Sequence, residues 1–466
     1  PTRRSSDLIS FSKCNCRKQM IKLTVGEICA ITGGKANCDL NLTVLEAPVF
    51  DSRKVKAGSF FLALKGENQD GHDFIGDAIS NGAIFALTSK SVSEPAVLVD
   101  DVLLALGKLA AYVRSQLNNL IVIGITGSQG KTTTKELLRH LLSQSGNTVA
   151  PEGSFNNELG APLTLLNCTE NTKYCIVELG ARHKGDIEKL AKIVRPSIGV
   201  VLTVGTAHIG EFGSRLKIAE TKGELINTLP SNGIAILGTY DDLTPTLAKN
   251  FAGKVITFGE SAEIRASDIE SREGHPHFDL VTPETRVSVA LKLIGLHQVP
   301  NALAAASVGF ALGIPTEKIA TALSTAEQSS KWRMELHELP GLLVINDSYN
   351  ANPESMTAAL KTLTLFAQER GGSAWAFLGT MHELGNSSDE EHKKIGKVCI
   401  ENEIDYLISI NQPNYGGILV PNKEAALKYV PEIAPGDVVL VKASRAEGLE
   451  ELASGIISAW LERGEN

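Results

Sequence analysis

Short apolar runs alternate with amphipathic stretches through the middle of the chain. The runs are bounded by glycine, proline or polar residues and lie at residues 120–126, 174–180, 198–205 and 233–238. Apolar side chains in the stretches between them recur at helical spacing. Such alternation is typical of a mostly parallel sheet that is covered by helices. We therefore expect a central α/β domain over residues 101–328.

The same alternation of apolar runs and amphipathic stretches occurs in the last part of the chain. Apolar runs alternate there with stretches of helical periodicity. The runs lie at residues 342–347, 373–379, 406–410 and 437–444, and the helical stretches at 354–370, 389–403 and 449–463. This pattern predicts a second α/β domain, Rossmann-like and doubly wound, over residues 329–466.

Two further segments have their own patterns. Residues 20–100 combine a short helical stretch with apolar runs at residues 60–64 and 84–88, which predicts a small α/β domain. Residues 274–295 are β-like throughout, and we expect them to form an antiparallel edge of the central domain. No period of 20–50 residues repeats, which argues against a solenoid.

The first nineteen residues stand apart from these patterns. They are basic, do not begin with methionine and contain no sustained apolar core of the kind found in signal peptides. Met20 then opens a normal domain start. We expect residues 1–19 to be a non-native or disordered leader without a role in function.

Composition narrows the classes of protein that remain. A chain of 466 residues is too long for one ordinary core. Its net charge of −8 argues against an electrostatic grip on nucleic acid, and no apolar run approaches the roughly 20 residues that span a membrane. Seven cysteines without a CxxC pair do not resemble a disulfide framework or a zinc site. We expect a cytoplasmic protein, monomeric by default.

The strongest chemical signal follows the first run of the central domain. An apolar strand leads into a glycine-rich turn and then a helix, in the sequence VIGITGSQGKTTTKELL. Backbone N–H groups of such a turn cradle phosphate, and the helix N-terminus adds positive partial charge. Lys131 would neutralise the β- and γ-phosphates, and the Thr132 hydroxyl would bind Mg²⁺. The predicted nucleotide-binding residues are Gly127, Ser128, Gly130, Lys131, Thr132 and Thr133.

This loop is a variant of the common one. The usual pattern requires glycine at position 125, where this chain has Ile125. The flanking strand and helix still predict a P-loop ATPase-like central domain that binds nucleotide.

Two downstream residues, Glu178 and His208, are candidates for the same site, and two lysines follow them on one helix. Glu178 ends an apolar run, at the sheet edge where a carboxylate can hold a metal ion, although an exposed strand-end charge is an equal alternative. His208 lies just past the next run. Lys222 and Lys217 share one predicted helix, where lysines are normally solvated and without function.

The ordered motifs resemble the Mur ligases, the ATP-dependent enzymes that build the peptide of bacterial peptidoglycan. The motifs that carry the resemblance are GITGSQGKTTTKE, FNNELGAPLTLL, ELGARHKGDI, AHIGEFGS, NDSYNANPESMTAAL, LGTMHELG and VKASR. Within that family they match the branch that joins D-Ala-D-Ala to a UDP-linked muramoyl tripeptide. The resemblance implies three domains and a two-step reaction through an acyl phosphate, with ATP and Mg²⁺ as cofactors.

The resemblance also implies roles for individual residues. Lys131, Glu178, His208 and Lys222 would be catalytic, and Thr132, Glu178, His208 and Lys222, the last as a carbamate, would hold Mg²⁺. ATP contacts would include Asn301, Arg333 and Asp347. Substrate contacts would be Asp51, Ser52 and Arg53 near the uridine diphosphate, the pair Asn156 and Asn157, and Tyr349, Asn350 and Asn352 near the dipeptide.

Four positions depart from the family pattern, and two other readings stay open. The departures are Gln298 for Asn, Trp332 for Gly, Thr380 for Asp and Ala443 for Gly. The alternatives are another Mur-type or folylpolyglutamate-type amide ligase, and a P-loop switch protein that uses nucleotide only to change shape. The sequence does not distinguish diaminopimelate from lysine as the third residue of the tripeptide.

Overall fold

The computed structural model describes residues 19–66, 69–207, 209–327 and 330–464. The chain divides into two compact units, which are described separately. One runs to Val113 and includes Leu166–Glu170, and the other comprises Arg114–Leu165 and the residues from Asn171 on. The expected leader lies outside the described residues except for Gln19, which already belongs to the first strand.

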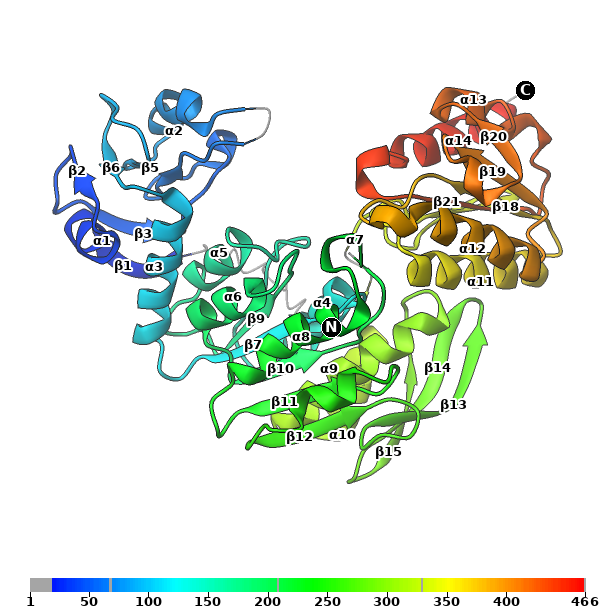
Figure 1. The fold of residues 1–466 in the computed structure, drawn as a ribbon, viewed down its shortest axis with the longest axis horizontal. Helices are drawn as coiled ribbons and strands as arrows, with labels where there is room; N and C mark the ends of the chain where they lie inside the picture. The colour runs from blue at the N-terminus through cyan, green and yellow to red at the C-terminus, as the bar shows by residue number, and fades with distance from the viewer. Residues whose placement is uncertain (1–18, 67–68, 208, 328–329, 465–466) are drawn as a thin grey trace, which may run out of the picture. The chain divides into compact units, whose positions relative to one another are not determined.

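The first unit is a small α/β structure with two sheets (Figure 1). Strands β1 (Gln19–Thr24) and β3 (Thr43–Glu46) pair antiparallel. The second sheet has the order β2 (Lys35–Ala36), β6 (Ala96–Leu98), β5 (Ala86–Thr88) and β4 (Phe61–Leu62). Its helices are α1 (Val25–Thr32), α2 (Ile75–Ser80) and the start of α3 (Val102–Gln116). Thr24 and Glu27 form a reciprocal cap that starts α1.

The second unit contains a central sheet of six parallel strands, as the alternating pattern predicted. Their order is β12 (Lys254–Phe258), β11 (Ile234–Gly238), β10 (Ile198–Val201), β7 (Ile121–Thr126), β9 (Tyr174–Glu178) and β8 (Thr148–Val149). The associated helices are α4 (Lys131–Ser143), α5 (Gly160–Leu166), α6 (Asp186–Val194), α7 (Ile209–Phe212), α8 (Arg215–Asn227), α9 (Val299–Ala311) and α10 (Thr316–Thr325). Helices α4 and α9 share one buried core with the sheet.

The expected antiparallel edge of the central domain is wrong in one respect. Strands β13 (Arg265–Arg272), β14 (His275–Val281) and β15 (Arg286–Ala290) form a separate three-stranded antiparallel sheet. Burial alternates along β14, and Phe278 and Leu280 on its inner face join the core around α9. A strand that buries only one face belongs to a half-exposed antiparallel sheet, whereas the central strands are buried on both faces.

The C-terminal part of this unit is a doubly wound sheet, as predicted. Its order is β16 (Glu335–Leu339), β17 (Leu342–Asn346), β21 (Val438–Lys442), β18 (Ala374–Leu378), β19 (Tyr406–Ile410) and β20 (Ile418–Val420). Residues that alternate along the strands pack to opposite sides, and each side has its own core. Helices α11 (Pro353–Arg370) and α12 (Ser388–Glu401) cover one face, and α13 (Lys423–Leu427) and α14 (Glu450–Gly464) cover the other (Figure 1).

One strand of this sheet was not expected. Strand β16 precedes β17 and pairs with it antiparallel, so the apolar run that begins at Leu342 is the second strand and not the first. The half-buried, mixed sequence of β16 is typical of an edge strand and lacks the apolar run that marks its neighbours. No helix in the described part of the chain is long and apolar enough to cross a bilayer.

Candidate functional site

A cavity of about 640 Å³ opens in the second unit where the carboxyl ends of strands from both sheets meet. The central sheet contributes the turn after β7, the end of β9 and the segment after β10. The C-terminal sheet contributes the segments after β17 and β18 and the end of β21. Carboxyl ends of parallel strands are where open α/β sheets bind ligands.

The predicted phosphate loop lies between β7 and α4 and lines this cavity. Lys131 Nζ donates to the Gly127 carbonyl at 2.7 Å, so the side chain folds back over its own loop. Ser128 Oγ accepts the Gly205 N–H at 2.9 Å, which ties the loop to the segment after β10. The loop therefore places the N-terminus of α4 and one cation at the same cavity, an arrangement suited to phosphate.

Gly130, just before α4, occupies a position that has no room for a side chain. Its φ is +81°, in the left-handed region, and a Cβ there would lie 2.2 Å from Asn301 Oδ1. Asn301 is itself held by Gln298, whose Oε1 accepts from Asn301 Nδ2 at 2.8 Å. The departure Gln298 thus supports the predicted nucleotide contact Asn301 and does not displace it from the cavity.

Glu178 ends β9 and is buried at the cavity wall. Thr132 Oγ1 donates to its Oε2 at 3.2 Å, and Asn156 Nδ2 donates to its Oε1 at 3.0 Å. A hydroxyl and a carboxylate side by side are hard oxygen donors of the kind that Mg²⁺ binds. Asn157, the other half of the predicted pair, is not among the cavity residues; its Oδ1 accepts the N–H groups of Leu159 and Gly160 at the start of α5.

The two lysines of α8 differ in how far they are buried. Lys222 is 7% exposed, whereas Lys217 is exposed. Burial lowers the pKa of Lys222 well below its usual range, and the positive charge of Lys131 lowers it further. Helix α8 packs closely on β7 and β10 because Gly124 and Gly199 on these strands have no side chains. A Cβ on either glycine would lie 3.0–3.1 Å from the Leu225 side chain of α8.

His208 lies outside the described residues. Among the residues that are described, no group of three His, Cys, Asp or Glu side chains is arranged to hold a metal ion. The oxygen donors that the structure does bring together are those of Thr132 and Glu178. A magnesium site here needs further ligands. Lys222 is not among the cavity residues, but its amine interacts with the charge of Lys131, and a carbamate on it is of the right chemistry.

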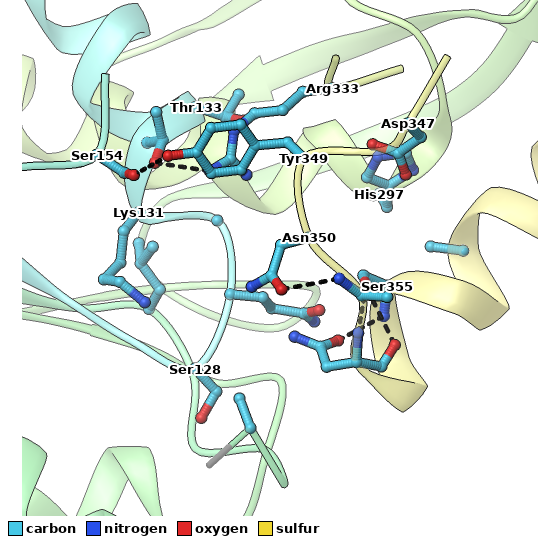
Figure 2. A pocket seen from close by; sticks show the side chains of 18 of the residues that line it. Ser128, Lys131, Thr133, Ser154, His297, Arg333, Asp347, Tyr349, Asn350 and Ser355 are labelled. Atoms are coloured by element: carbon cyan, nitrogen blue, oxygen red, sulfur yellow. Dashed lines mark hydrogen bonds between the residues drawn. The ribbon is translucent and has the colours of Figure 1, made fainter. Parts of the chain in front are cut away.

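Arg333 and Tyr349 join the C-terminal sheet to the phosphate loop. The Arg333 guanidinium lies 4.0 Å above the Tyr349 ring, and its Nη2 donates to Thr132 Oγ1 at 3.4 Å. The Tyr349 hydroxyl makes a short hydrogen bond with Ser154, as Figure 2 shows. Tyr349 therefore positions Arg333 beside the phosphate loop, a role that the sequence did not indicate.

Asp347 is bound on both carboxylate oxygens. Lys442 Nζ donates to Oδ2 at 2.6 Å and Met334 N–H to Oδ1 at 3.0 Å. Asp347 and Lys442 are both buried, and His297 from α9's preceding turn also lines this part of the cavity (Figure 2). The carboxylate is thus fixed as an acceptor at the cavity wall with its charge already balanced.

Burial lowers the pKa of His297 to about 4. The positive charge of Lys442 also lowers this pKa, whereas the negative charge of Asp347 raises it. An unfolded chain binds a proton on His297 from about pH 6.5 downward, while the folded protein resists it until about pH 4. Stability is therefore full above pH 6.5 and falls as the pH drops through this window. Because the ring is only half-buried and faces the cavity, we expect a loss of about 1–2 kcal/mol.

Urea unfolding at about pH 7.5 and about pH 4.5 checks this expectation. The His297→Gln variant keeps a polar side chain and should lose about 1–2 kcal/mol less than the wild type over that interval. Equal losses in the two proteins would mean that His297 titrates normally.

The segment after β17 is both a helix start and a cavity wall. Asn352 Oδ1 accepts the Ser355 N–H at 2.8 Å and caps α11, and Asn350 Oδ1 accepts the Ala351 N–H at 2.9 Å. Glu354 Oε1 accepts both the N–H and the hydroxyl of Thr206 at 2.8 Å. Since these asparagine oxygens are engaged within the segment, it is the Asn350 and Asn352 amide nitrogens that remain to meet a ligand.

The remaining departures from the family pattern have visible consequences. Trp332 has a φ of +58°, a conformation that suits the glycine usual there, and its ring lies 4.3 Å below the Arg445 guanidinium. Thr380 accepts the Ser444 N–H through its carbonyl at 3.0 Å, a contact that its side chain does not determine. Ala443 packs in the core beside Gly379.

The residues predicted to lie near uridine diphosphate belong to the first unit. Asp51 caps the short 3-10 helix Ser52–Lys54. Arg53 pairs with both oxygens of Asp51, Nε to Oδ1 at 2.9 Å and Nη2 to Oδ2 at 3.0 Å, and its side chain is 86% exposed. This exposed guanidinium–carboxylate pair has the polarity to contact a diphosphate or a base.

Family models and known relatives agree on where this chain belongs. Residues 49–114 match the Mur ligase family catalytic domain, 125–309 the Mur ligase middle domain, and 332–445 the Mur ligase glutamate ligase domain. The UDP-N-acetylmuramoyl-tripeptide–D-alanyl-D-alanine ligase of Mycobacterium tuberculosis is 39% identical, over 94% of this chain and 98% of its own length.

Solved structures point the same way. The crystal structure of MurF from Acinetobacter baumannii has a TM-score of 0.86 at 33% identity and covers 94% of this chain and 99% of its own. The structure of MurF ligase from Thermotoga maritima in complex with ADP has a TM-score of 0.75 at 32% identity, covering 89% and 98%. The chain belongs to the Mur ligase family.

Proposed function

We propose that this protein is the ATP-dependent ligase that joins D-Ala-D-Ala to UDP-N-acetylmuramoyl-tripeptide in the synthesis of peptidoglycan precursors. The observation that carries this function is the single cavity in which the phosphate loop of the central sheet meets the NDSYNANPES segment of the C-terminal sheet. Relatives that match this chain over nearly its full length are named for this reaction.

The chemistry needs two steps. An oxygen of the tripeptide's free carboxylate attacks the γ-phosphorus of ATP, and ADP leaves. The amine of D-Ala-D-Ala then attacks the carbonyl carbon of the acyl phosphate. Phosphate leaves with the electrons of the broken C–O bond, and the amine nitrogen loses a proton as the peptide bond forms. Phosphorylation is required because a carboxylate is a poor electrophile.

We assign the phosphoryl transfer to residues at the central sheet. Gly127, Ser128, Gly130, Thr132 and Thr133 would hold the phosphates through the loop, and Lys131 would neutralise charge on the transferring group. When bound, Mg²⁺ would supply further charge neutralisation; we propose Thr132, Glu178, His208 and carbamylated Lys222 as its ligands. Arg333, held by Tyr349 beside Thr132, would contact the phosphates from the C-terminal side.

Carbamylation of Lys222 is consistent with its surroundings. The neutral amine attacks CO₂ and loses one proton, which leaves a carboxylate in place of a cation. Burial and the charge of Lys131 both favour the neutral amine that this step requires. A buried lysine that stayed cationic would repel Mg²⁺, whereas the carbamate can bind it.

Position in the cavity supports the other substrate roles that the family resemblance implies. Asn301 and Asp347 would contact the adenine and ribose ends of ATP, and Asn156 would face the tripeptide beside Glu178. Asn350 and Asn352 would place the dipeptide through their free amide nitrogens. Tyr349, which lines the same cavity, would contact the dipeptide as well and would also hold Arg333 beside the phosphates. Asp51, Ser52, Arg53 and Asn157 are proposed substrate contacts that lie outside this cavity.

We also propose three domains, residues 20–100, 101–328 and 329–466, in a cytoplasmic monomer. The sheets support this division, because each is built from strands of one part of the chain: β1–β6, β7–β15 or β16–β21. The free thiols Cys29, Cys38, Cys175 and Cys399 suit a reducing compartment.

One assay tests the function. Phosphate release is measured with ATP, Mg²⁺, the UDP-linked tripeptide and D-Ala-D-Ala, and with each acceptor or donor left out in turn. We expect release that requires both the tripeptide and the dipeptide. Release that is indifferent to the dipeptide would support a switch protein, and release with a single amino acid in its place would support a neighbouring amide ligase.

A double-mutant cycle tests the link between Tyr349 and Ser154. Tyr349→Phe keeps the ring under Arg333 and removes the hydroxyl, and Ser154→Ala removes its partner. Each should lower kcat/KM for ATP by about fivefold, the cost of roughly one hydrogen bond. The double variant should be no worse than either single one, and multiplicative losses would show that the two hydroxyls act separately.

A further inference from the structure

Lys135 is a buried charged residue that the reaction described above does not use. It lies on α4, three residues beyond Thr132, and its side chain is fully buried. A lysine is rarely buried in this way unless its ammonium group is fully paired, because removing the charge from water costs several kcal/mol. The contacts of this ammonium group therefore indicate what the residue is for.

All three N–H donors of Lys135 have an acceptor. Nζ donates to the Pro151 carbonyl at 2.8 Å and to the Gly153 carbonyl at 2.6 Å, and it pairs with Glu136 Oε1 at 2.8 Å. Two of the three acceptors are backbone groups of one loop, residues 151–157. Lys135 thus fastens this loop to the helix that begins at the phosphate loop.

The fastened loop carries residues that reach the centre of the site. Asn156 donates to Glu178 Oε1, and Ser154 bonds to Tyr349. The other oxygen of Glu178 accepts from Thr132 at the start of α4. The contacts form a closed ring from Lys135 through the loop to Asn156, to Glu178, to Thr132 and back along α4.

We propose that Lys135 is a positioning residue that holds the 151–157 loop so that Asn156 and Thr132 fix the two oxygens of Glu178, and that it thereby sets the metal affinity of the site. The inference rests on the proposed role of Glu178 as a magnesium ligand. Residues that orient a ligating carboxylate commonly change metal affinity by 10- to 100-fold when removed, because the ligand then samples other rotamers.

The direction in which cation affinity changes when Lys135 is replaced distinguishes a positioning role from a purely electrostatic one. Lys135→Met keeps the length of the side chain and removes the charge and all three donors. If Lys135 acted only through its charge, its loss would leave Glu136 less compensated and would tighten the binding of a cation. If it positions Glu178, its loss weakens cation binding.

The experiment measures Mn²⁺ binding to the full chain by electron paramagnetic resonance, in the presence of a non-hydrolysable ATP analogue. The wild type, Lys135→Met, Asn156→Ala and the double variant are compared. We expect Lys135→Met and Asn156→Ala each to raise the Kd for Mn²⁺ by about tenfold or more. The double variant should bind Mn²⁺ no more weakly than Asn156→Ala alone, because both changes release the same carboxylate.

Leu142→Ala is the matched control. Leu142 is fully buried on the same helix and packs in the central core. It should lower the melting temperature at least as much as Lys135→Met and leave the Kd for Mn²⁺ within about twofold of the wild type. If Lys135→Met does not fold, Lys135→Gln, which keeps two N–H donors, should weaken Mn²⁺ binding by about threefold or more.

Three results would overturn the inference. The first is an unchanged or tighter Mn²⁺ affinity in a folded Lys135→Met or Lys135→Gln protein. The second is a loss of affinity that Leu142→Ala reproduces. The third is a wild type that binds no Mn²⁺ in this assay, which would remove the proposed metal site as well and so is distinguishable from the first two.

Discussion

Replacing Lys131 by alanine is expected to lower kcat for ligation by about 1,000-fold or more. Removing one preorganised donor from a developing oxyanion commonly costs 10²–10³ in kcat, and Lys131 carries a full positive charge. Its Nζ donates to the Gly127 carbonyl at 2.7 Å, so it lies at the loop without a fixed anionic partner of its own. The measurement is steady-state phosphate release at saturating concentrations of all three substrates.

The fold should survive this change. Lys131 is only half-buried, and in the described part of the chain its side chain donates one hydrogen bond, to the Gly127 carbonyl of its own loop. We therefore expect the melting temperature to stay within a few degrees of the wild type. Lys131→Arg keeps the charge but not the compact shape of the ammonium, and its activity should fall between those of the wild type and Lys131→Ala. Activity near that of the wild type in Lys131→Ala would mean that the loop has been assigned wrongly.

Lys222→Ala is expected to be almost inactive, with a loss of about 100-fold or more in kcat, and to recover part of its activity when short carboxylates are added. If the functional form is a carbamate, the variant lacks a metal-binding carboxylate, which formate or acetate can replace from solution. The change also removes a 7%-exposed side chain from the interior, so the space that the carboxylate needs is created by the substitution itself.

Lys217→Ala is the control, because it removes an exposed lysine of the same helix. It should be fully active and indifferent to carboxylates. Nuclear magnetic resonance with ¹³CO₂ gives a second measurement: a carbamate signal is expected in the wild type and in Lys217→Ala and should be missing in Lys222→Ala. A carbamate signal that survives in Lys222→Ala would place the modification elsewhere.

The local patterns of the chain predict much of the site because its parts follow strand ends. Glu178 and the phosphate loop were found from apolar runs that stop at a polar residue, and parallel strands bring such ends to one edge. Lys222 could not be told from a surface lysine by its helix alone. Its burial depends on how α8 packs on the central sheet, where Gly124 and Gly199 leave room for Leu225 of the same helix.

The contacts that cross the sequence were beyond prediction from pattern. Lys442 pairs with Asp347 across 95 positions, and Lys135 reaches carbonyls that carry no side-chain signal at all. Asn352 was expected to face the dipeptide, and its oxygen caps a helix, because the same residue type suits both tasks. The separate sheet β13–β15 was missed for a related reason, since alternation predicts a strand but not its partner.

Gly130 and Asn301 have a consequence for how this site can be altered. The carboxamide of Asn301 fills the volume in which a residue at position 130 would place its first carbon. A larger side chain at either position would therefore clash with the other, although the two are 171 residues apart in the chain. A larger residue at position 301 would push on the turn at Gly130. With Asn301 at the adenine and this turn at the phosphates, as proposed above, a change made to alter base selectivity would also alter the geometry of phosphoryl transfer.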